Sequence, residues 1–330
     1  MHIQFAPLFA DPSTGAALEL HIDERKGDQV ISGELRSPTT GYPIVRGVPR
    51  FVEPGNYSGS FGYQWNRWPR LQFDSENVGQ PMQGHTGRMF ESITGASRLD
   101  GQLLVDLGCG PGRFVEIARQ KGARVIAIDY SAAVEAAAQN FAGDPEVCVC
   151  QADALALPLR AASVDGVYSI GVLHHTPDPA RGVAQAARVT RPEGWIALSV
   201  YGKGGYYDFP SVQFWRRVFQ RLWPVTGPNP ALAYSYATAY GLRPLGHIPR
   251  IGPALSKAAR LMFPFVPLPD VCWSILDTFD SVTPSYQSAH SPHEVFDWLR
   301  SAGLVDIRPS PWGIATFRAR KPVREFALHA

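Results

Sequence analysis

The central third of the chain alternates apolar runs with amphipathic segments. Runs rich in Val, Ile, Leu and Ala predict buried strands at 102–107, 123–128, 146–150, 164–170 and 194–200. Segments of helical periodicity between them predict helices at 112–121, 131–141 and 178–190. Because strands and helices alternate, we expect a parallel sheet with helices on both faces.

The segments on either side of this core have a different character. Residues 1–55 contain short β-rich pieces and turns, and residues 56–100 are aromatic and polar, which predicts helices that cover a ligand site. Residues 203–270 are rich in Pro, Tyr, Trp and Arg, with amphipathic stretches at 212–223 and 254–262. We interpret this segment as a helical lid inserted into the fold.

The last segment, 271–330, is expected to complete the fold. A serine, a proline and a glutamate within 291–294 form an N-terminal capping pattern for a helix that ends at Gly303. Two strands at about 304–309 and 312–319 then close the sheet as an antiparallel edge.

Composition narrows the functional classes. Of the 330 residues, 45% are hydrophobic and 18% are charged, which suits a folded chain and argues against a disordered one. The net charge of +2 lacks the basic footprint of a nucleic-acid-binding protein, and no apolar run reaches the roughly 18 residues of a membrane span. The four cysteines show no CxxC spacing and we recognise no signal peptide, so we expect a reduced, cytoplasmic protein.

The most informative motif is the glycine loop at 106–112, which reads Asp-Leu-Gly-Cys-Gly-Pro-Gly and ends the first predicted strand of the core. Spaced glycines let bare backbone approach a ligand, because a Cβ atom would hold the ligand off. The next apolar strand ends at Asp129, where a carboxylate can accept both hydroxyls of a ribose. Together they predict a nucleoside-containing ligand.

A dinucleotide-dependent dehydrogenase also carries a glycine loop. Its fingerprint is G-x-G-x-x-G, whereas the third glycine here comes one residue earlier and Asp106 precedes the first glycine by two positions. The Gln-Ala-Asp-Ala segment at 151–154 and the His-His pair at 174–175 have no place in that pattern. We therefore set the dehydrogenase interpretation aside.

Five motifs in order resemble those of class I S-adenosylmethionine-dependent methyltransferases. They are the glycine loop, Asp129, the segment at 151–154, the strand that leads to the His-His pair, and Arg-Pro-Glu-Gly-Trp at 191–195. The resemblance covers about residues 85–202 and implies an α/β fold with a Rossmann-like, seven-stranded, mostly parallel sheet. It implies an N-terminal module (1–55), a helical cofactor cover (56–100), a cofactor-binding core (101–202), a helical lid (203–270) and a C-terminal completion of the fold (271–330).

The N-terminal module resembles a degenerate, Trm112-like zinc ribbon of one bacterial branch of these enzymes. The peptides Asp-Pro-Ser-Thr-Gly at 11–15 and Ser-Pro-Thr-Thr-Gly at 37–41 look like zinc knuckles with both cysteines replaced. An aspartate, a serine and two threonines stand at the would-be ligand positions, and neutral hydroxyls do not make a thiolate site. We expect no metal here.

By the same resemblance, the cofactor is S-adenosylmethionine, with S-adenosylhomocysteine as its product. Asp106 would engage the methionine ammonium, Asp129 the ribose hydroxyls, and Tyr130 would lie along the adenine. For two of these residues a structural role stays open as the alternative: Asp106 could cap the loop without contacting the cofactor, and Asp153 could cap a turn. The full set of expected cofactor contacts is Gln64, Trp65, Arg88, Asp106, Gly108, Cys109, Gly110, Gly112, Asp129, Tyr130, Asp153, Ala154, Ile170 and Gly171.

Methyl transfer depends on alignment of the acceptor and exclusion of water more than on covalent help. An acceptor hydroxyl also needs a base, and His174 and His175 follow the fourth core strand at the end where ligands bind. Strand alternation favours His174 as the one that faces the pocket, with the other packing or capping the following turn. The branch resemblance suggests that Asp280 and Tyr286 contact the acceptor.

The sequence therefore predicts a methyltransferase that acts on a small molecule, with O-methylation favoured over N- or C-methylation and no metal, membrane or nucleic-acid partner. One alternative is an RNA or protein methyltransferase that docks through the N-terminal module, and another is a non-catalytic cofactor-binding protein. No motif in the sequence indicates the acceptor or the oligomeric state. The RNA alternative would be favoured by a basic face formed by Arg216, Arg217, Arg221, Arg243, Arg250 and Arg260.

Overall fold

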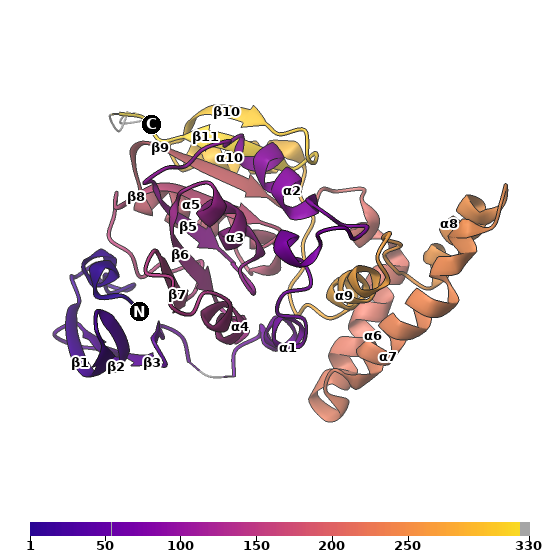
Figure 1. Cartoon of the computed structure of the whole chain (residues 1–330). Helices are drawn as coiled ribbons and strands as arrows, with labels where there is room; N and C mark the ends of the chain where they lie inside the picture. Colours follow the sequence, from indigo (N-terminus) through magenta and orange to yellow (C-terminus); the bar gives the residue numbers. More distant parts are fainter. Residues whose placement is uncertain (54, 324–330) are drawn as a thin grey trace.

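The core of the protein is a seven-stranded sheet, seen in a computed structural model that describes residues 1–53 and 55–323 (Figure 1). The strands lie in the order β10-β11-β9-β8-β5-β6-β7. The expected Rossmann-like sheet is therefore present, and every predicted core strand overlaps an observed one. The bounds are β5 Leu103–Leu107, β6 Arg124–Asp129, β7 Val147–Gln151, β8 Val164–Ile170, β9 Thr190–Ser199, β10 Val305–Pro309 and β11 Thr316–Arg320.

The two faces of the sheet bury separate clusters of side chains. Leu103, Val105 and Leu107 of β5 belong to the cluster that packs against α5, α10 and the N-terminal module. Leu104 belongs to the cluster formed with α2, α3 and α4 on the other face. Successive side chains of a strand point to opposite faces, so one apolar run supplies both halves of the core. The helices are α2 His85–Thr94, α3 Arg113–Gln120, α4 Ala133–Asn140, α5 Pro179–Val189 and α10 Pro292–Ser301.

The C-terminal strands close the sheet with one difference from the prediction. β11 runs antiparallel to β9, with Phe317 opposite Leu198. β10 pairs antiparallel with β11 and therefore runs in the same direction as the core strands. Only one strand of the predicted edge opposes the sheet, because the short connection between β10 and β11 reverses the chain.

The N-terminal module is a separate antiparallel sheet of four strands packed on one face of the main sheet. Phe5 and Phe9 are fully buried in the same cluster as α5. The backbone N–H of Phe51 donates to the carbonyl of Gln151 at 2.8 Å, which ties the end of the module to β7. The module comprises the 3-10 turn η1 Ile3–Leu8 and the strands β1 Glu19–Lys26, β2 Gln29–Arg36, β3 Gly41–Val45 and β4 Val48–Pro49.

A carboxylate stabilises the first knuckle-like turn. Asp11 Oδ1 accepts the N–H groups of Ser13 and Thr14, both at 2.9 Å, and Oδ2 accepts the hydroxyl of Tyr42 at 3.1 Å. Burial acts to raise the pKa of Asp11, but these hydrogen bonds and one from Ser37 outweigh it and lower the pKa. Among the described residues, no group of three or more His, Cys, Asp or Glu side chains is arranged to hold a metal ion.

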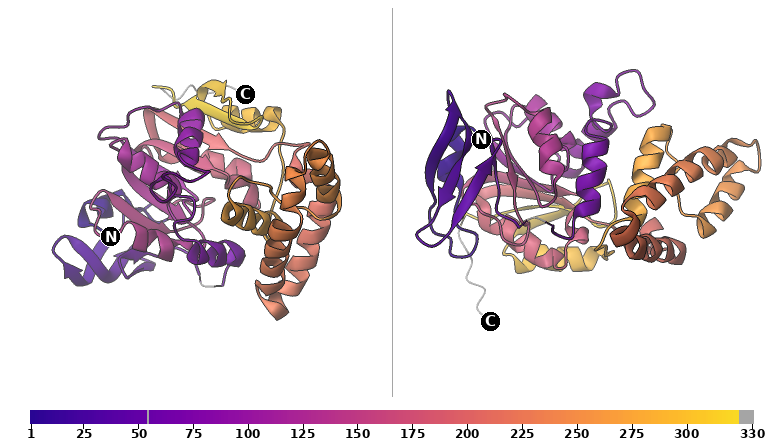
Figure 2. Two further views of the ribbon diagram at one scale, coloured as in Figure 1. Left: turned by 45° about the vertical axis from the view of Figure 1, so that its right-hand side comes forward. Right: turned by 90° about the horizontal axis from the view of Figure 1, so that it is seen from below.

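Helices cover the carboxyl ends of the central strands. α1 (Gly59–Arg67) and α9 (Val271–Val282) lie next to the sheet, whereas α6, α7 and α8 project beyond α9 away from it (Figures 1 and 2). The amphipathic stretches predicted in the lid fall within α6 and α8. These and the short 3-10 elements have the bounds α6 Pro210–Thr226, α7 Asn229–Gly241, α8 Gly252–Met262, η2 Asp74–Glu76, η3 Leu173–His175, η4 Tyr206–Asp208 and η5 Arg243–His247.

The sequence pattern does not reveal α7 or α9. α9 buries eight of its twelve residues, so it lacks the polar face on which helical periodicity depends. Within residues 1–53 and 55–323, none of the helices has both the length and the apolar character needed to cross a bilayer.

Candidate active site

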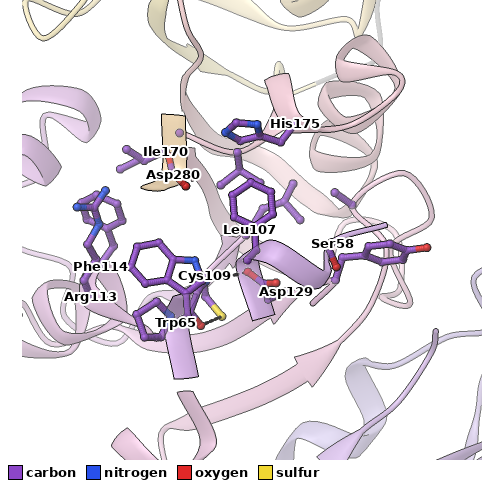
Figure 3. A pocket seen from close by; sticks show the side chains of 18 of the residues that line it. Ser58, Trp65, Leu107, Cys109, Arg113, Phe114, Asp129, Ile170, His175 and Asp280 are labelled. Atoms are coloured by element: carbon purple, nitrogen blue, oxygen red, sulfur yellow. Dashed lines mark hydrogen bonds between the residues drawn. The ribbon is translucent and has the colours of Figure 1, made fainter. Parts of the chain in front are cut away.

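A cavity of about 320 Å³ lies at the carboxyl ends of β5, β6 and β8 and is bounded by α1 and α9 (Figure 3). Open parallel sheets bind ligands at this edge, because the loops that follow the strands leave a crevice there. The walls come from segments far apart in the sequence. Most of them fall within residues 57–65, 107–114, 128–130, 152–154, 170–176 and 273–280.

The three glycines of the loop all have positive φ, of 86° at Gly108, 55° at Gly110 and 98° at Gly112. Gly108 and Gly110 line the cavity together with Cys109, as expected, but Gly112 does not. A Cβ atom on Gly112 would lie 2.3 Å from the ring of Phe141. Close packing against Phe141, at the end of α4, and the positive φ both require glycine at position 112.

Asp129, at the end of β6, both supports the glycine loop and faces the cavity (Figure 3). Its Oδ2 accepts the N–H of Gly110 at 2.9 Å, and its Oδ1 accepts the N–H and hydroxyl of Ser131 at 2.8 and 2.7 Å. Burial raises the pKa of Asp129, and these hydrogen bonds oppose the rise. Since an ionised carboxylate offers about four acceptor positions, some remain for hydroxyls of a ligand.

Tyr130, Asp153 and Ala154 line the cavity beside Asp129. The ring of Tyr57 lies 5.0 Å from that of Tyr130, between centroids. Asp153 Oδ1 accepts the N–H of Leu155 at 2.8 Å, so this carboxylate caps a turn while it also borders the cavity. Ile170 and Gly171 border the cavity from the end of β8.

Asp106 lies beneath the loop and does not line the cavity. It is 1% exposed, and its Oδ2 has no hydrogen-bond partner among the described residues. Burial raises the pKa of Asp106 well above its ordinary value, while the neighbouring Tyr168 hydroxyl acts in the opposite direction. A buried carboxylate oxygen without a partner is costly, and a donor delivered by a ligand or by water would satisfy it.

Arg113, the first residue of α3, extends a cationic side chain into the cavity (Figure 3). Its Nη1 donates to Oε1 of Gln72 at 2.7 Å. Arg88, which we expected to pair with the cofactor carboxylate, is exposed on α2 and does not line the cavity. Arg113, in contrast, begins α3 directly after the glycine loop, which brings its side chain to the cavity.

Of the two expected contacts on α1, one lines the cavity. Trp65 does so, and its indole ring would lie 3.2 Å from a Cβ atom on Gly110. Gln64 is fully buried outside the lining, where its Nε2 donates to Oδ1 of Asp280 at 2.8 Å. Gln64 therefore positions a carboxylate of the cavity and does not border the ligand space itself.

His175, not His174, faces the cavity (Figure 3). The strand ends before the pair, and the 3-10 turn η3 breaks the alternation on which the preference for His174 rested. The ring centroid of His175 lies 4.9 Å from that of Phe61. His174 is fully buried, with its ring 3.7 Å from that of Tyr201 and both ring nitrogens unpartnered among the described residues. Burial lowers the pKa of both histidines.

Two carboxylates of α9, Asp277 and Asp280, line the cavity. Asp277 Oδ1 accepts the side-chain N–H of Gln72 at 3.1 Å. Burial and repulsion by Asp280 raise the pKa of Asp277 to about 7, although Arg113 and Gln72 oppose the shift. Asp280 was expected here, and Asp277 precedes it by three positions on α9, which places both on one face of the helix.

Aromatic rings form the remaining wall. Tyr201 and Tyr207 stack with their centroids 3.7 Å apart, and both line the cavity. Tyr286, expected to contact the acceptor, is 45% exposed and does not line the cavity. Its backbone carbonyl instead lies 2.9 Å from Nδ1 of His175.

Several cavity residues were not predicted from the sequence. For Arg113 a signal existed, because it directly follows the glycine loop. Tyr207 and Trp273 lie in segments whose path across the sheet is set by tertiary packing, and one sequence gives no spacing from which to place them.

Comparison with known proteins identifies the core. Residues 105–198 match the family model described as "Methyltransferase domain". A ubiquinone biosynthesis O-methyltransferase of Paracidovorax citrulli is 31% identical over 156 residues, which cover 46% of this chain and 63% of that protein. A probable tRNA methyltransferase 9B of Homo sapiens is 32% identical over 104 residues, covering 31% of this chain and 22% of that one.

Among solved structures, a putative S-adenosyl-L-methionine-dependent methyltransferase of Methanococcus maripaludis has a TM-score of 0.45 and 14% identity, covering 84% of this chain and all of that one. The chain spans less than two thirds of the length of the curated relatives named above.

Proposed function

We propose that this chain, in which residues 105–198 form a methyltransferase domain of the S-adenosylmethionine-dependent class, transfers a methyl group from S-adenosylmethionine to a small-molecule acceptor, with oxygen as the favoured acceptor atom. The observation that carries the proposal is a single cavity with the ribose-type carboxylate Asp129 and the candidate base His175 both on its walls. The likeness to ubiquinone biosynthesis O-methyltransferases supports the choice of oxygen.

The residues present fit the cofactor. Asp129 has acceptor positions left for the ribose hydroxyls, and Tyr130 and Asp153 border the space beside it for the adenine. Asp106 lies beneath the loop and outside the lining, so its unpartnered Oδ2 would meet the ammonium through a bridging water. Arg113, which lines the cavity, suits the carboxylate of the same amino-acid group. S-adenosylmethionine supplies, when bound, a methyl group on a sulfonium that leaves readily.

The protein supplies placement, a dry surrounding and a proton acceptor. The rings of Phe61, Trp65 and Tyr201 line the cavity and exclude water from the reacting atoms. The Nδ1–H of His175 donates to the Tyr286 carbonyl, so Nε2 keeps its lone pair and can accept a proton from an acceptor hydroxyl. Because burial lowers the pKa of His175, the ring is neutral at pH 7, which a base requires.

The same cavity bears on the two alternative functions, an RNA or protein methyltransferase and a non-catalytic cofactor-binding protein. Helices α1 and α9 border it, which suits a small acceptor better than a folded RNA. The likeness to a probable tRNA methyltransferase keeps an RNA acceptor as the second candidate. Protein fills the space around His174, but the space beside His175 is open, which counts against a purely non-catalytic role.

The proposal is tested in two steps. Calorimetric titration with S-adenosylmethionine and S-adenosylhomocysteine measures cofactor binding to the wild type, to Asp129→Ala and to a control, Asp100→Ala, whose carboxylate is exposed and does not line the cavity. Loss of binding only in Asp129→Ala is expected, and full-strength binding in that variant would refute the cofactor assignment. A screen of phenols, carboxylic acids and amines with labelled cofactor, followed by mass analysis, then identifies the acceptor atom.

A further inference from the structure

The segment between η4 and α9, residues 209–269, contains basic residues but no acidic ones. We call it the helical arm; it contains α6, α7, η5 and α8. All 29 acidic residues of the chain lie outside it, although the net charge of the whole chain is only +2. Its seven basic residues are Arg216, Arg217, Arg221, Arg243, Arg250, Lys257 and Arg260.

Three of these basic side chains are engaged by other groups of the protein. Arg216 is buried and donates to the carbonyl of Ser281 at 3.3 Å. Arg243 donates to the carbonyls of Leu268 and Pro269, and the guanidinium of Arg260 lies over the ring of Tyr206. The other four are exposed: Arg217, Arg221, Arg250 and Lys257. None of these four forms an ion pair with a described Asp or Glu, and all four are exposed to solvent.

The arm also exposes more large apolar side chains than the rest of the molecule. It carries ten of the nineteen exposed large hydrophobic residues of the described chain. Ile251 at the N-cap of α8 (55% exposed) and Leu255 (39%) and Met262 (66%) within α8 follow helical spacing and form an apolar stripe. The buried side of α8 consists of Gly252 and Ser256, so its larger side chains are directed outward.

α6 continues this surface. Phe214 (57% exposed) and Val225 (87%) flank Arg217 and Arg221 along α6, and all four are exposed at helical spacing. The two helices meet where the indole N–H of Trp215 donates to the carbonyl of Met262 at 3.0 Å. The apolar and basic side chains of α6 and α8 therefore belong to one part of the molecule, the part that projects farthest from the sheet (Figure 2).

Charge decides which partner fits this surface. A second copy of the arm would bring two uncompensated positive surfaces together, which costs free energy. RNA would match the positive charge but would leave exposed aliphatic side chains such as Val225 and Met262 without a role. An anionic bilayer offers phosphate groups for the basic side chains and acyl chains for the apolar ones.

We propose that the helical arm docks on the surface of an anionic phospholipid bilayer, with α6 and α8 lying in the interface and not spanning it. The exposed apolar side chains enter the boundary of the acyl chains, while Arg217, Arg221 and Lys257 contact lipid phosphates. Docking brings the cavity to the membrane, because α9 packs against α6 and α7 and also lines the cavity.

The test is flotation of the full-length protein with vesicles of phosphatidylcholine, with and without phosphatidylglycerol, in the absence of cofactor and acceptor. We expect binding only to the anionic vesicles and weaker binding as salt is raised. The triple variant Arg217→Gln, Arg221→Gln, Lys257→Gln should bind on the order of 100-fold more weakly, since each basic side chain contributes roughly fivefold. Leu255→Ser with Met262→Ser should also lose binding.

Matched controls separate docking from general effects of charge and polarity. Arg25→Gln with Lys26→Gln removes exposed basic residues from the N-terminal module, and Val78→Ser removes an exposed apolar residue outside the arm; both should bind as the wild type does. Phe214→Ser with Val225→Ser repeats the apolar test on α6 if the α8 variant is unstable. Melting curves verify that each variant is folded.

Three results would overturn the proposal. The first is the absence of binding to phosphatidylglycerol vesicles, and the second is arm variants that bind as tightly as the wild type. The third is evidence that the arm binds something other than a membrane. Such evidence would be a wild-type dimer that the α8 variant converts to monomer, or binding of single-stranded RNA without binding to vesicles. Because cofactor binding is measured separately, failure here leaves the proposed methyl transfer untouched.

Discussion

Nδ1 of His175 lies 2.9 Å from the backbone carbonyl oxygen of Tyr286, 111 residues later in the chain. A carbonyl only accepts hydrogen bonds, so this contact assigns the proton to Nδ1 and the lone pair to Nε2. The segment that follows α9 therefore sets the tautomer of a side chain at the end of β8. The assignment gives the two adjacent histidines different roles.

Replacing His175 by alanine should lower kcat by 10²- to 10⁴-fold with an acceptor hydroxyl, the usual contribution of a general base. The matched change His174→Ala should reduce the melting temperature more than the turnover, because that ring is buried against Tyr201. Steady-state kinetics and melting curves of the two variants check this. Full activity in His175→Ala would leave alignment alone as the mechanism.

The pH profile of the wild type provides an independent check on the same residue. Burial lowers the pKa of His175, so the neutral base persists below the ordinary histidine pKa of about 6.5. The acidic limb of kcat/KM should therefore fall below pH 6.5. A limb well above pH 6.5 would mean that a different group is titrating.

Changing Arg113 to glutamine should weaken the binding of S-adenosylhomocysteine by roughly 10- to 100-fold, because a charge-assisted hydrogen bond to a carboxylate is worth about 1.5–3 kcal/mol. Methylthioadenosine, which lacks the amino-acid group, should bind the variant as tightly as it binds the wild type. Arg88→Gln is the matched control, since that side chain is exposed outside the cavity. Equal weakening for both ligands would argue against the assigned role of Arg113.

Asp277 should make the ligand-free protein less stable as pH rises. Its pKa is raised to about 7 by burial and by Asp280, so the folded state holds a proton that the unfolded state releases above about pH 4. The stability from this group is fully present below pH 4 and is lost as pH approaches 7. Asp277→Asn should then be more stable than the wild type at pH 8 by about 1–3 kcal/mol, and the two should converge toward pH 4. Denaturant titrations across pH measure the difference, and a constant difference would contradict the shifted pKa.

Gly112→Ala should destabilise the fold more than Gly143→Ala, although both glycines have positive φ. A Cβ atom on Gly143 meets no heavy atom within 4 Å, so its cost is that of the backbone conformation, about 1–2 kcal/mol. On Gly112 the new atom would meet Phe141, which adds roughly 1–3 kcal/mol. Urea denaturation of both variants tests the comparison, and equal losses would mean that Phe141 moves aside at no cost.

The parts of the fold that follow local rules could be predicted from the sequence. β5 through β9 are buried runs whose bounds depend on their own apolar residues, and the glycine loop and Asp129 are adjacent once two parallel strands pair. α9 could not be predicted, because burial on most sides erases its periodicity. The orientation of the histidine pair was missed because a 3-10 turn begins where an extended strand had been assumed.

The residues on the acceptor side of the cavity could not be predicted for a different physical reason. Gln64 and Asp280 are 216 positions apart and meet only because α1 and α9 pack together. Arg88 lies on the helix before β5 and Arg113 on the helix after the loop, and the packing of α2 and α3 decides which of them enters the cavity. A single sequence contains no pattern from which this packing of helices could be predicted.

α9 bears on the enzyme's kinetics because one helix both contacts the arm and presents Asp277 and Asp280 to the cavity. A protein bound to a membrane through its arm would meet a lipid-soluble acceptor by diffusion within the plane of the membrane. Its rate would then follow the mole fraction of acceptor in the lipid, so that adding inert lipid at constant total acceptor slows turnover by surface dilution.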